Sequence, residues 1–243
     1  MCKMVANLSN ITTVILAGGL GTRLRTAIPG RPKVLAEIHN RPFLTFLLDQ
    51  LVSAGARNVV LCTGYMADEI HEKLGKVYKS LRLVYSKEDE PLGTGGALRL
   101  ALPYLNSDPV LVMNGDSFVK VDLTGYLNWF FEKDIQASLI LTKVRDTGRY
   151  GRVLMDKDGR ITHFEEKGGS SGEGWINAGI YLLNRRLLRT IPVSVAVSLE
   201  REMFPSWIGR ELYGYRSEGY FIDIGTPETY VKAEEFFAEE ECL

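Results

Sequence analysis

The sequence has few of the residues that build disulfide scaffolds, zinc clusters or histidine-based catalytic sites. Among its 243 residues there are 3 cysteines and 3 histidines. Cys2, Cys62 and Cys242 form no C-x-x-C pair and leave an odd number, so neither structural zinc nor a disulfide framework is expected. A reducing, cytoplasmic environment fits this low cysteine content.

Long apolar runs and an excess of one charge are also missing. No run of about 18 apolar residues occurs, and the N-terminal segment, with sequons at Asn7 and Asn10, lacks the apolar core of a signal peptide. Lys and Arg number 29 against 30 Asp and Glu. Without a basic excess, neither nucleic acid nor a membrane surface is an expected partner. The expected partner is a small ligand, and a homo-oligomer remains open.

The two commonest phosphate-binding fingerprints are absent. The dinucleotide motif G-x-G-x-x-G fails at Leu24, which stands where a third glycine would pack a helix against the sheet. The P-loop motif fails because Gly75-Lys76 is not followed by Ser or Thr. These absences disfavour a simple dehydrogenase and a P-loop kinase.

The most informative segment is a glycine-rich loop near the N-terminus. The apolar run Thr13–Ala17 predicts a buried strand, and Gly18–Arg23 follows it directly. Glycine amides can approach a polyphosphate without a Cβ in the way, while Arg23 and Lys33 supply side-chain cations. The segment predicts a nucleotide site, although a plain tight turn would also use such glycines.

Strands and helices are predicted to alternate over about the first 145 residues. Predicted strands cover Val59–Cys62, Leu81–Tyr85, Pro109–Met113 and Ala137–Leu141, and predicted helices cover Phe43–Val52, Ala67–Leu74, Gly96–Leu102 and Leu123–Phe131. Such a series predicts an α/β fold with a Rossmann-like, doubly wound, mostly parallel sheet and helices on both faces. Its ligands would bind beyond the carboxyl ends of the strands.

The pattern changes after about residue 145. Arg152–Leu154 and Arg160–Phe164 flank an Asp-Gly turn and predict a hairpin, and Ile176–Leu183 predicts a further strand. Helices are predicted over Ser198–Trp207 and Glu228–Phe237. No repeat or Pro/Ser-rich linker divides the chain. Residues 1–243 are therefore expected to form one domain, with halves at about 12–145 and about 146–243.

Two aspartates far apart in the sequence are candidate metal ligands. Asp116 follows a predicted strand, and Asp223 lies in the segment Phe221–Glu228. Carboxylates at strand ends can hold a hard cation such as Mg²⁺ against phosphates. Either residue could instead be a cap: Asp116 in a turn, Asp223 before a helix that begins at Pro227.

Two further signals lie in the second half. The cluster Glu165-Glu166-Lys167 at a strand end is most often a solvated face. Asn177, however, stands in an otherwise apolar strand, where a buried amide needs hydrogen-bond partners. Sugar hydroxyls would suit it because an amide both donates and accepts.

Together these segments resemble the sugar-1-phosphate nucleotidyltransferases. The resemblance runs from residue 12 to about 238 and rests on Leu16–Arg23 with Lys33, Glu90–Ala97, Asn114–Asp116, Phe164–Lys167, Asn177–Gly179 and Ile222–Glu228. Within the family the chain is most similar to the D-glycero-α-D-manno-heptose 1-phosphate guanylyltransferases, and next to the mannose-1-phosphate guanylyltransferases. One departure is Val34, where many relatives have proline.

The resemblance implies a role for each candidate residue and adds a small β-rich sugar-binding insertion to the fold. The nucleotide would be bound by Leu16, Ala17, Gly18, Gly19, Gly21, Thr22, Arg23, Glu90, Gly95 and Asn114. The sugar would be bound by Tyr150, Gly151, Glu166, Lys167 and Asn177. Catalysis would involve Arg23, Lys33, Asp116 and Lys167, with Mg²⁺ held by Asp116 and Asp223.

The implied reaction joins a sugar 1-phosphate to the α-phosphorus of a nucleoside triphosphate and releases pyrophosphate. GTP is favoured over ATP because the carboxylate of Glu90 only accepts hydrogen bonds, and guanine presents the paired donors N1–H and N2–H. The uracil N3–H leaves UTP open, and Glu90 could also be a plain solvated residue. Mannose-1-phosphate guanylyltransferase, a member using UTP, CTP or dTTP, and a non-catalytic nucleotide-sugar sensor are the alternatives. A sensor would be expected to lose Arg23, Lys33 or the two aspartates, and all are present.

Overall fold

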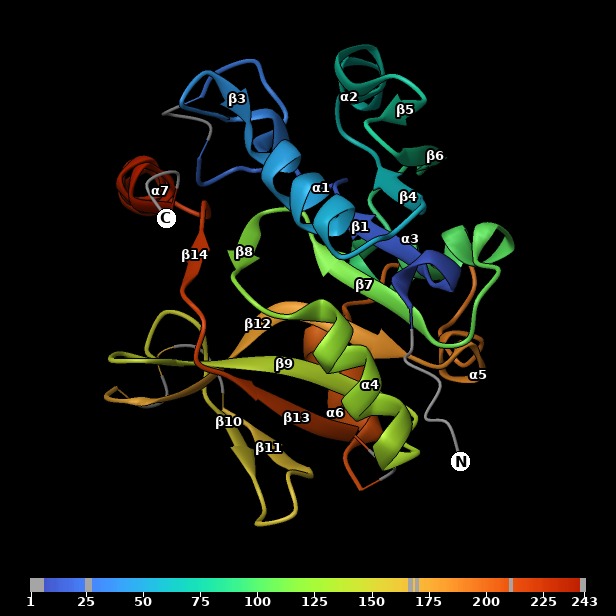
Figure 1. Cartoon of the computed structure of the whole chain (residues 1–243), viewed down its shortest axis with the longest axis vertical. Coiled ribbons are helices and arrows are strands. Elements are labelled where there is room, and N and C mark those ends of the chain that lie inside the picture. The colour runs from blue at the N-terminus through green and yellow to red at the C-terminus, as the bar shows by residue number, and fades with distance from the viewer. Residues whose placement is uncertain (1–6, 25–27, 166–167, 169–170, 210–211, 241–243) are drawn as a thin grey trace.

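The computed structural model describes residues 7–24, 28–165, 168, 171–209 and 212–240. Their centre is an eight-stranded sheet (Figure 1). Across the sheet the strands are β13 (Leu212–Ser217), β9 (Ala137–Val144), β12 (Gly174–Leu183), β7 (Val110–Asn114), β1 (Thr12–Leu16), β4 (Asn58–Thr63), β6 (Leu81–Lys87) and β5 (Val77–Tyr78). Strands β7, β1, β4 and β6 are parallel to one another, whereas β12 runs antiparallel to both of its neighbours.

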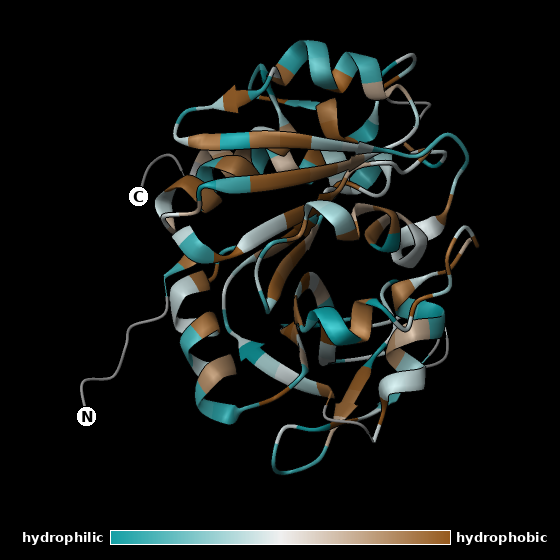
Figure 2. Ribbon diagram, turned by 90° about the vertical axis from the view of Figure 1, so that its right-hand side faces the viewer, coloured by the Kyte–Doolittle hydropathy of each residue, from teal (hydrophilic) through white to brown (hydrophobic). Residues whose placement is uncertain are grey.

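Helices cover both faces of this sheet. In β1, Val14 and Ile15 are both fully buried, yet they belong to cores on opposite faces. One core includes side chains of α1 (Phe43–Ser53), α2 (Ala67–Leu74), α4 (Leu123–Lys133) and α7 (Pro227–Glu240); the other includes α3 (Gly93–Ala101), α5 (Arg185–Leu188), the π-helix η4 (Leu199–Met203) and α6 (Phe204–Trp207). Central strands are accordingly largely brown in Figure 2, as expected between two helical layers. The predicted doubly wound α/β fold is confirmed.

Three short strand pairs lie outside the main sheet. They are β2 (Glu37–Ile38) with β3 (Arg41–Pro42), β10 (Val153–Met155) with β11 (Ile161–Phe164), and β8 (Ser117–Val119) with β14 (Phe221–Asp223). The β10–β11 pair confirms the predicted hairpin. The β8–β14 pair brings the last part of the chain beside the end of β7, as Figure 1 shows. Short 3-10 turns cover Leu8–Asn10 (η1), Lys33–Leu35 (η2) and Leu102–Tyr104 (η3).

Several predicted boundaries were displaced. Strand β6 continues to Lys87, two residues beyond its predicted end, and α3 begins at Gly93 rather than Gly96. The helix expected over Ser198–Trp207 is instead the π-helix η4 followed by the single turn α6. Strand β13 was not predicted.

Strands from both predicted halves share the one sheet, because β9 precedes and β12 and β13 follow residue 145. The division into a nucleotide half and a sugar half stays a proposal. In the part of the chain that the structure describes, no helix has the length and apolar character needed to cross a bilayer.

Candidate active site

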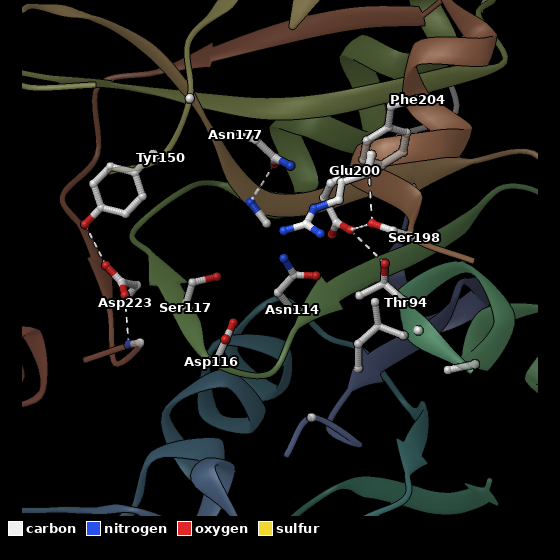
Figure 3. Close-up of a pocket in the computed structure, with 18 of the residues that line it drawn as sticks. Thr94, Asn114, Asp116, Ser117, Tyr150, Asn177, Ser198, Glu200, Phe204 and Asp223 are labelled. Carbon is white, nitrogen blue, oxygen red and sulfur yellow. Dashed lines mark hydrogen bonds between the residues drawn. The ribbon is translucent and has the colours of Figure 1, made fainter. Parts of the chain in front are cut away.

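A cleft of about 610 Å³ opens where β1, β4 and β7 end, and its opposite wall comes from the second half of the chain (Figure 3). Candidates from both halves meet there. Those lining it are Leu16, Gly18, Gly19, Arg23, Lys33, Asn114, Asp116, Tyr150, Gly151, Asn177 and Asp223. Ala17, Gly21, Thr22, Glu90 and Gly95 are not among the lining residues. Glu166 and Lys167 lie outside the described residues.

The glycine-rich loop forms one rim of the cleft. At Gly18 an added Cβ would lie 2.8 Å from Glu88 Oε1, so a larger residue there would force the Glu88 carboxylate to move. Gly21 has a φ of 59°, and a Cβ there would lie 3.0 Å from Lys33 Cβ. Behind the rim, the Ala17 N–H donates to the carbonyl of Cys62 at 2.8 Å. Gly21 and Ala17 therefore shape the loop, while Gly18 leaves its backbone open to a ligand.

Lys33 and Asp116 form an ion pair in the cleft. Lys33 Nζ donates to Asp116 Oδ2 at 2.5 Å, and the side chains are 10% and 45% exposed. Burial alone would raise the pKa of Asp116, but the ammonium of Lys33 outweighs it and lowers the pKa below its ordinary value. Asp116 is thus ionised at neutral pH.

Backbone pairing brings Asp223 to the same place. Asp223 pairs with Ser117 across β8 and β14, and the Ile224 N–H donates to the carbonyl of Asp116 at 2.9 Å. A Cβ added to Gly225 would lie 2.5 Å from Asp223 Oδ1 and 3.8 Å from Lys33 Nζ. The ion pair of Lys33 and Asp116 and the carboxylate of Asp223 therefore lie in the same part of the cleft, where Arg149 Nη2 is 3.7 Å from Asp223 Oδ2.

Asp223 also contacts the second half of the chain. Tyr150 donates its hydroxyl to Asp223 Oδ2 at 2.6 Å, and the Gly225 N–H donates to Oδ1 at 2.8 Å. Burial raises the pKa of Tyr150, and the neighbouring carboxylate of Asp223 raises it further. Tyr150 therefore stays a neutral donor throughout the physiological range.

The two aspartates suit a metal ion held jointly with a ligand rather than a closed protein site. Their donor set is oxygen only, as magnesium prefers, and phosphate oxygens and water would fill the remaining positions. Within the described residues, no three or more His, Cys, Asp or Glu side chains gather closely enough to enclose a metal. This arrangement fits a metal that arrives with a phosphate-bearing substrate.

The remaining sugar-site candidates lie on the opposite wall. Gly151 has a φ of 79° and donates its N–H to the carbonyl of Thr147, which closes the loop that carries Tyr150. Asn177 Oδ1 accepts the Gly179 N–H at 2.8 Å, and its amide nitrogen donates to the Tyr181 hydroxyl at 3.0 Å. The amide of Asn177 is only partly buried, and it has hydrogen-bond partners within the protein.

Two of the nucleotide-site candidates, both in the segment Glu90–Ala97, do not line the cleft. Glu90 is exposed and outside the cleft lining. The Gly95 N–H, at the start of α3, donates to the carbonyl of Val197 at 2.8 Å and is not open to a ligand. Their roles toward a nucleotide stay predictions.

Glu88 is a cleft residue that the sequence analysis missed. It directly follows β6 and is 9% exposed, with Oε2 accepting the Leu92 N–H at 3.1 Å. Added Cβ atoms at Gly18 and Gly64 would lie 2.8 Å and 2.7 Å from its Oε1. Burial raises the pKa of Glu88, although the Leu92 hydrogen bond opposes it. If β6 had been predicted to end at Lys87, Glu88 would have been recognised as the residue at the carboxyl end of that strand, where ligands bind.

Glu200 is a second missed residue. It lies on η4, lines the cleft and accepts hydrogen bonds from Thr94 Oγ1 at 2.7 Å and Ser198 Oγ at 3.0 Å. Because π-helices are rare and periodicity seldom predicts them, the sequence pattern did not indicate that Glu200 would face the cleft.

Comparison with known sequences identifies relatives that match nearly the whole chain. A D-glycero-α-D-manno-heptose 1-phosphate guanylyltransferase from Aneurinibacillus thermoaerophilus is 37% identical over 222 residues, which are 91% of this chain and 96% of the relative. Mannose-1-phosphate guanylyltransferase catalytic subunit beta from Drosophila melanogaster is 36% identical over 236 residues, 95% of this chain but 64% of the relative.

Solved structures give the same result. HddC from Yersinia pseudotuberculosis superimposes with a TM-score of 0.85 at 34% identity, covering 93% of this chain and 99% of HddC. A structure of HddC complexed with GMP-PN superimposes with a TM-score of 0.83 at 33% identity, over 93% of this chain and 99% of that one. Residues 12–240 match the Nucleotidyl transferase family, so this chain is a nucleotidyltransferase and belongs to that family.

Proposed function

We propose that this chain transfers GMP from GTP to a sugar 1-phosphate, with D-glycero-α-D-manno-heptose 1-phosphate as the expected acceptor, and releases pyrophosphate. The observation that carries the proposal is that the ion pair of Lys33 and Asp116 and the carboxylate of Asp223 line one cleft together with the glycine-rich loop. Two relatives that match nearly the whole chain support these substrates: one is named as a heptose 1-phosphate guanylyltransferase, and the other was solved in complex with GMP-PN. A cytoplasmic location is part of the proposal.

The reaction exchanges one phosphorus–oxygen bond for another. A phosphate oxygen of the sugar 1-phosphate attacks the α-phosphorus of GTP, and the bond to pyrophosphate breaks in line. That oxygen is already ionised, so no proton acceptor is needed. The site must instead offset negative charge, which Lys33 and Arg23 would do at the cleft rim.

Members of this family generally use divalent metal ions. We propose Mg²⁺ here, held by the carboxylates of Asp116 and Asp223. When bound, it would offset the charge of the phosphates during transfer. The hydroxyl of Tyr150 and the N–H of Gly225 would hold Asp223 in one orientation.

Glu88 replaces Glu90 as our candidate for recognising the base. Its carboxylate is buried in the wall beside Gly18, and a carboxylate can only accept hydrogen bonds. Guanine offers two adjacent donors, N1–H and N2–H, which suit such an acceptor. The predicted sugar contacts of Tyr150, Gly151 and Asn177 remain part of the proposal, as do those of Glu166 and Lys167.

The proposal is tested by measuring pyrophosphate release with five nucleoside triphosphates against several sugar 1-phosphates. We expect the highest kcat/KM for GTP with heptose 1-phosphate. Mannose 1-phosphate is the second candidate acceptor, because relatives named for it match 90% or more of this chain. A clear preference for UTP or CTP would overturn the guanylyltransferase assignment.

A further inference from the structure

Five polar side chains form one hydrogen-bonded group across the cleft wall, and Figure 3 shows four of them, Thr94, Asn114, Asn177 and Glu200. The hydroxyl of Tyr181 lies 3.2 Å from Asn114 Nδ2, 3.0 Å from Asn177 Nδ2 and 3.3 Å from Glu200 Oε1. Glu200 Oε2 in turn accepts from Thr94 Oγ1 at 2.7 Å. The group therefore joins strands β7 and β12 to η4 and to the start of α3.

The chemistry of these groups fixes the direction of each bond. An ionised carboxylate has no proton to give, so the single hydroxyl proton of Tyr181 must point to Glu200. The phenol oxygen can then only accept from Asn114 and Asn177. Both amides must present nitrogen, not oxygen, to Tyr181.

Two separate observations agree with this direction. Asn177 Oδ1 accepts the Gly179 N–H at 2.8 Å, which by itself requires the same orientation of that amide. Asn114 Oδ1 is buried and has no hydrogen-bond partner among the described residues. Because a buried amide oxygen without a partner is unfavourable, another interaction must hold the Asn114 amide in this orientation, and its hydrogen bond to Tyr181 is the one observed.

Glu200 is itself held rigidly. Thr94 Oγ1 accepts the Leu199 N–H at 2.8 Å while its hydroxyl proton points to Glu200. Ser198 Oγ donates to the same carboxylate oxygen at 3.0 Å. The π-helical turn thus supplies an acceptor that is held by the hydroxyls of Thr94, in α3, and Ser198, at the start of the turn itself.

We propose that Glu200 is a positioning residue that, through Tyr181, holds Asn114 as a hydrogen-bond donor toward the cleft, where Asn114 and Asn177 together read a hydroxyl oxygen of a substrate. Asn177 is held in the same orientation by the Gly179 N–H as well. Each amide uses one N–H on Tyr181, and the second N–H of each is available in a cleft that both residues line. This inference rests on the proposed function. The hydroxyl belongs to the sugar 1-phosphate or to the ribose of GTP.

The test compares kcat/KM for complete substrates with that for analogues lacking one hydroxyl. One arm uses a series of monodeoxy sugar 1-phosphates, and the other uses 2′-deoxy-GTP and 3′-deoxy-GTP. For the unmodified enzyme we expect one analogue to lose at least about tenfold, the loss that two charge-free hydrogen bonds allow. The arm in which it falls identifies the sugar or the ribose as the source.

In Tyr181→Phe and Glu200→Leu, that same loss should shrink to about threefold, because the amide of Asn114 is free to turn its oxygen into the cleft while the Gly179 N–H still orients Asn177. The ring of Tyr181 packs edge-on against Phe204 at 4.8 Å, so the phenylalanine variant keeps its packing. Glu200→Gln retains a carbonyl oxygen that can accept the phenol proton and should keep more discrimination than Glu200→Leu.

Tyr126→Phe is the matched control. Tyr126 is also fully buried, and its hydroxyl pairs with Ser138 Oγ at 2.6 Å and accepts the Leu182 N–H at 3.2 Å. It does not line the cleft, so it should lose stability without changing the discrimination. Full discrimination in both Tyr181→Phe and Glu200→Leu would overturn the inference. Absence of any transfer by the unmodified enzyme would overturn the proposed function itself, and the inference with it.

Discussion

Lys33 Nζ and Asp116 Oδ2 lie 2.5 Å apart, although the two residues are 83 positions apart in the sequence. The lysine comes from the segment after the glycine-rich loop, and the aspartate comes from the end of β7. Their pairing puts a largely buried cation in the cleft, against one of the two candidate metal-binding carboxylates. We propose that the phosphate groups of the substrates bind beside this pair and interact with its charges.

Asp116→Asn should lower kcat by about 10²-fold or more, because a neutral amide is a poor ligand for Mg²⁺. The variant is measured at saturating substrates over a range of Mg²⁺ concentrations. A rate near that of the unmodified enzyme at high Mg²⁺ would remove Asp116 from the metal site.

The same variant has a predicted pH signature in stability. Since the pKa of Asp116 is lowered in the folded protein, its carboxylate stabilises the fold above the ordinary aspartate range, and this contribution is lost as pH falls through the lowered pKa. In chelator, Asp116→Asn should therefore unfold more easily than the unmodified protein at pH 7. The difference should shrink in denaturant titrations as the pH falls below the ordinary aspartate range. A difference independent of pH would contradict the assignment.

Tyr150→Phe should raise the Mg²⁺ concentration needed for half-maximal rate by about tenfold, because Asp223 loses the hydroxyl that orients it. The ring itself packs edge-on against Phe221 at 5.6 Å and should stay in place. Titration of activity with Mg²⁺ at fixed GTP checks this. An unchanged half-maximal concentration would show that Tyr150 does not act through Asp223.

Gly18→Ala and Gly19→Ala form a matched pair within one loop. A Cβ at Gly18 meets the buried carboxylate of Glu88, whereas a Cβ at Gly19 has open space within 4 Å. Gly18→Ala should lower the free energy of unfolding by about 1–3 kcal/mol. Gly19→Ala should stay within about 0.5 kcal/mol. Equal effects of the two substitutions would show that the close approach seen at Gly18 is not required.

Glu88→Gln and Glu90→Gln separate the two candidates for base recognition. Glu88→Gln should reduce the preference for GTP over UTP by about tenfold or more, since an amide turns one acceptor into a donor facing guanine. Glu90→Gln, on an exposed residue, should leave the preference unchanged. The ratio of kcat/KM values for GTP and UTP is the measurement, and the reverse pattern would restore Glu90.

Lys167→Ala should raise KM for the sugar 1-phosphate and leave KM for GTP nearly unchanged. A charge-assisted contact to the sugar phosphate is worth roughly 1.5–3 kcal/mol. Equal weakening of both substrates would indicate an effect on folding or a surface position.

The sheet could be predicted because its central strands are apolar on both faces and alternate with amphipathic helices. Strand β13 was missed because Gly214 and Arg216 interrupt its apolar pattern, although Gly214 is needed where Met155 and Leu141 press against its backbone. Strands β8 and β14 have three residues each and pair across about a hundred positions, so no local pattern indicates them.

The site was predictable where it followed a strand and less so where it depended on side-chain contacts. The predicted base-binding carboxylate was Glu90, but the buried carboxylate that follows β6 is Glu88. Strand β6 also ends two residues later than predicted. The hydrogen bonds of Tyr181 to two amides and to Glu200 join three elements, β7, β12 and η4, and only the folded chain brings them together.

The most direct test of the proposed transfer follows the α-phosphate of GTP. The unmodified enzyme is incubated with α-labelled GTP, Mg²⁺ and heptose 1-phosphate, and the products are separated. We predict that the label enters a GDP-sugar while unlabelled pyrophosphate is released, and that Asp116→Asn loses this product. Label recovered only as GTP, or as free GMP or GDP without a sugar, would contradict GMP transfer by this site.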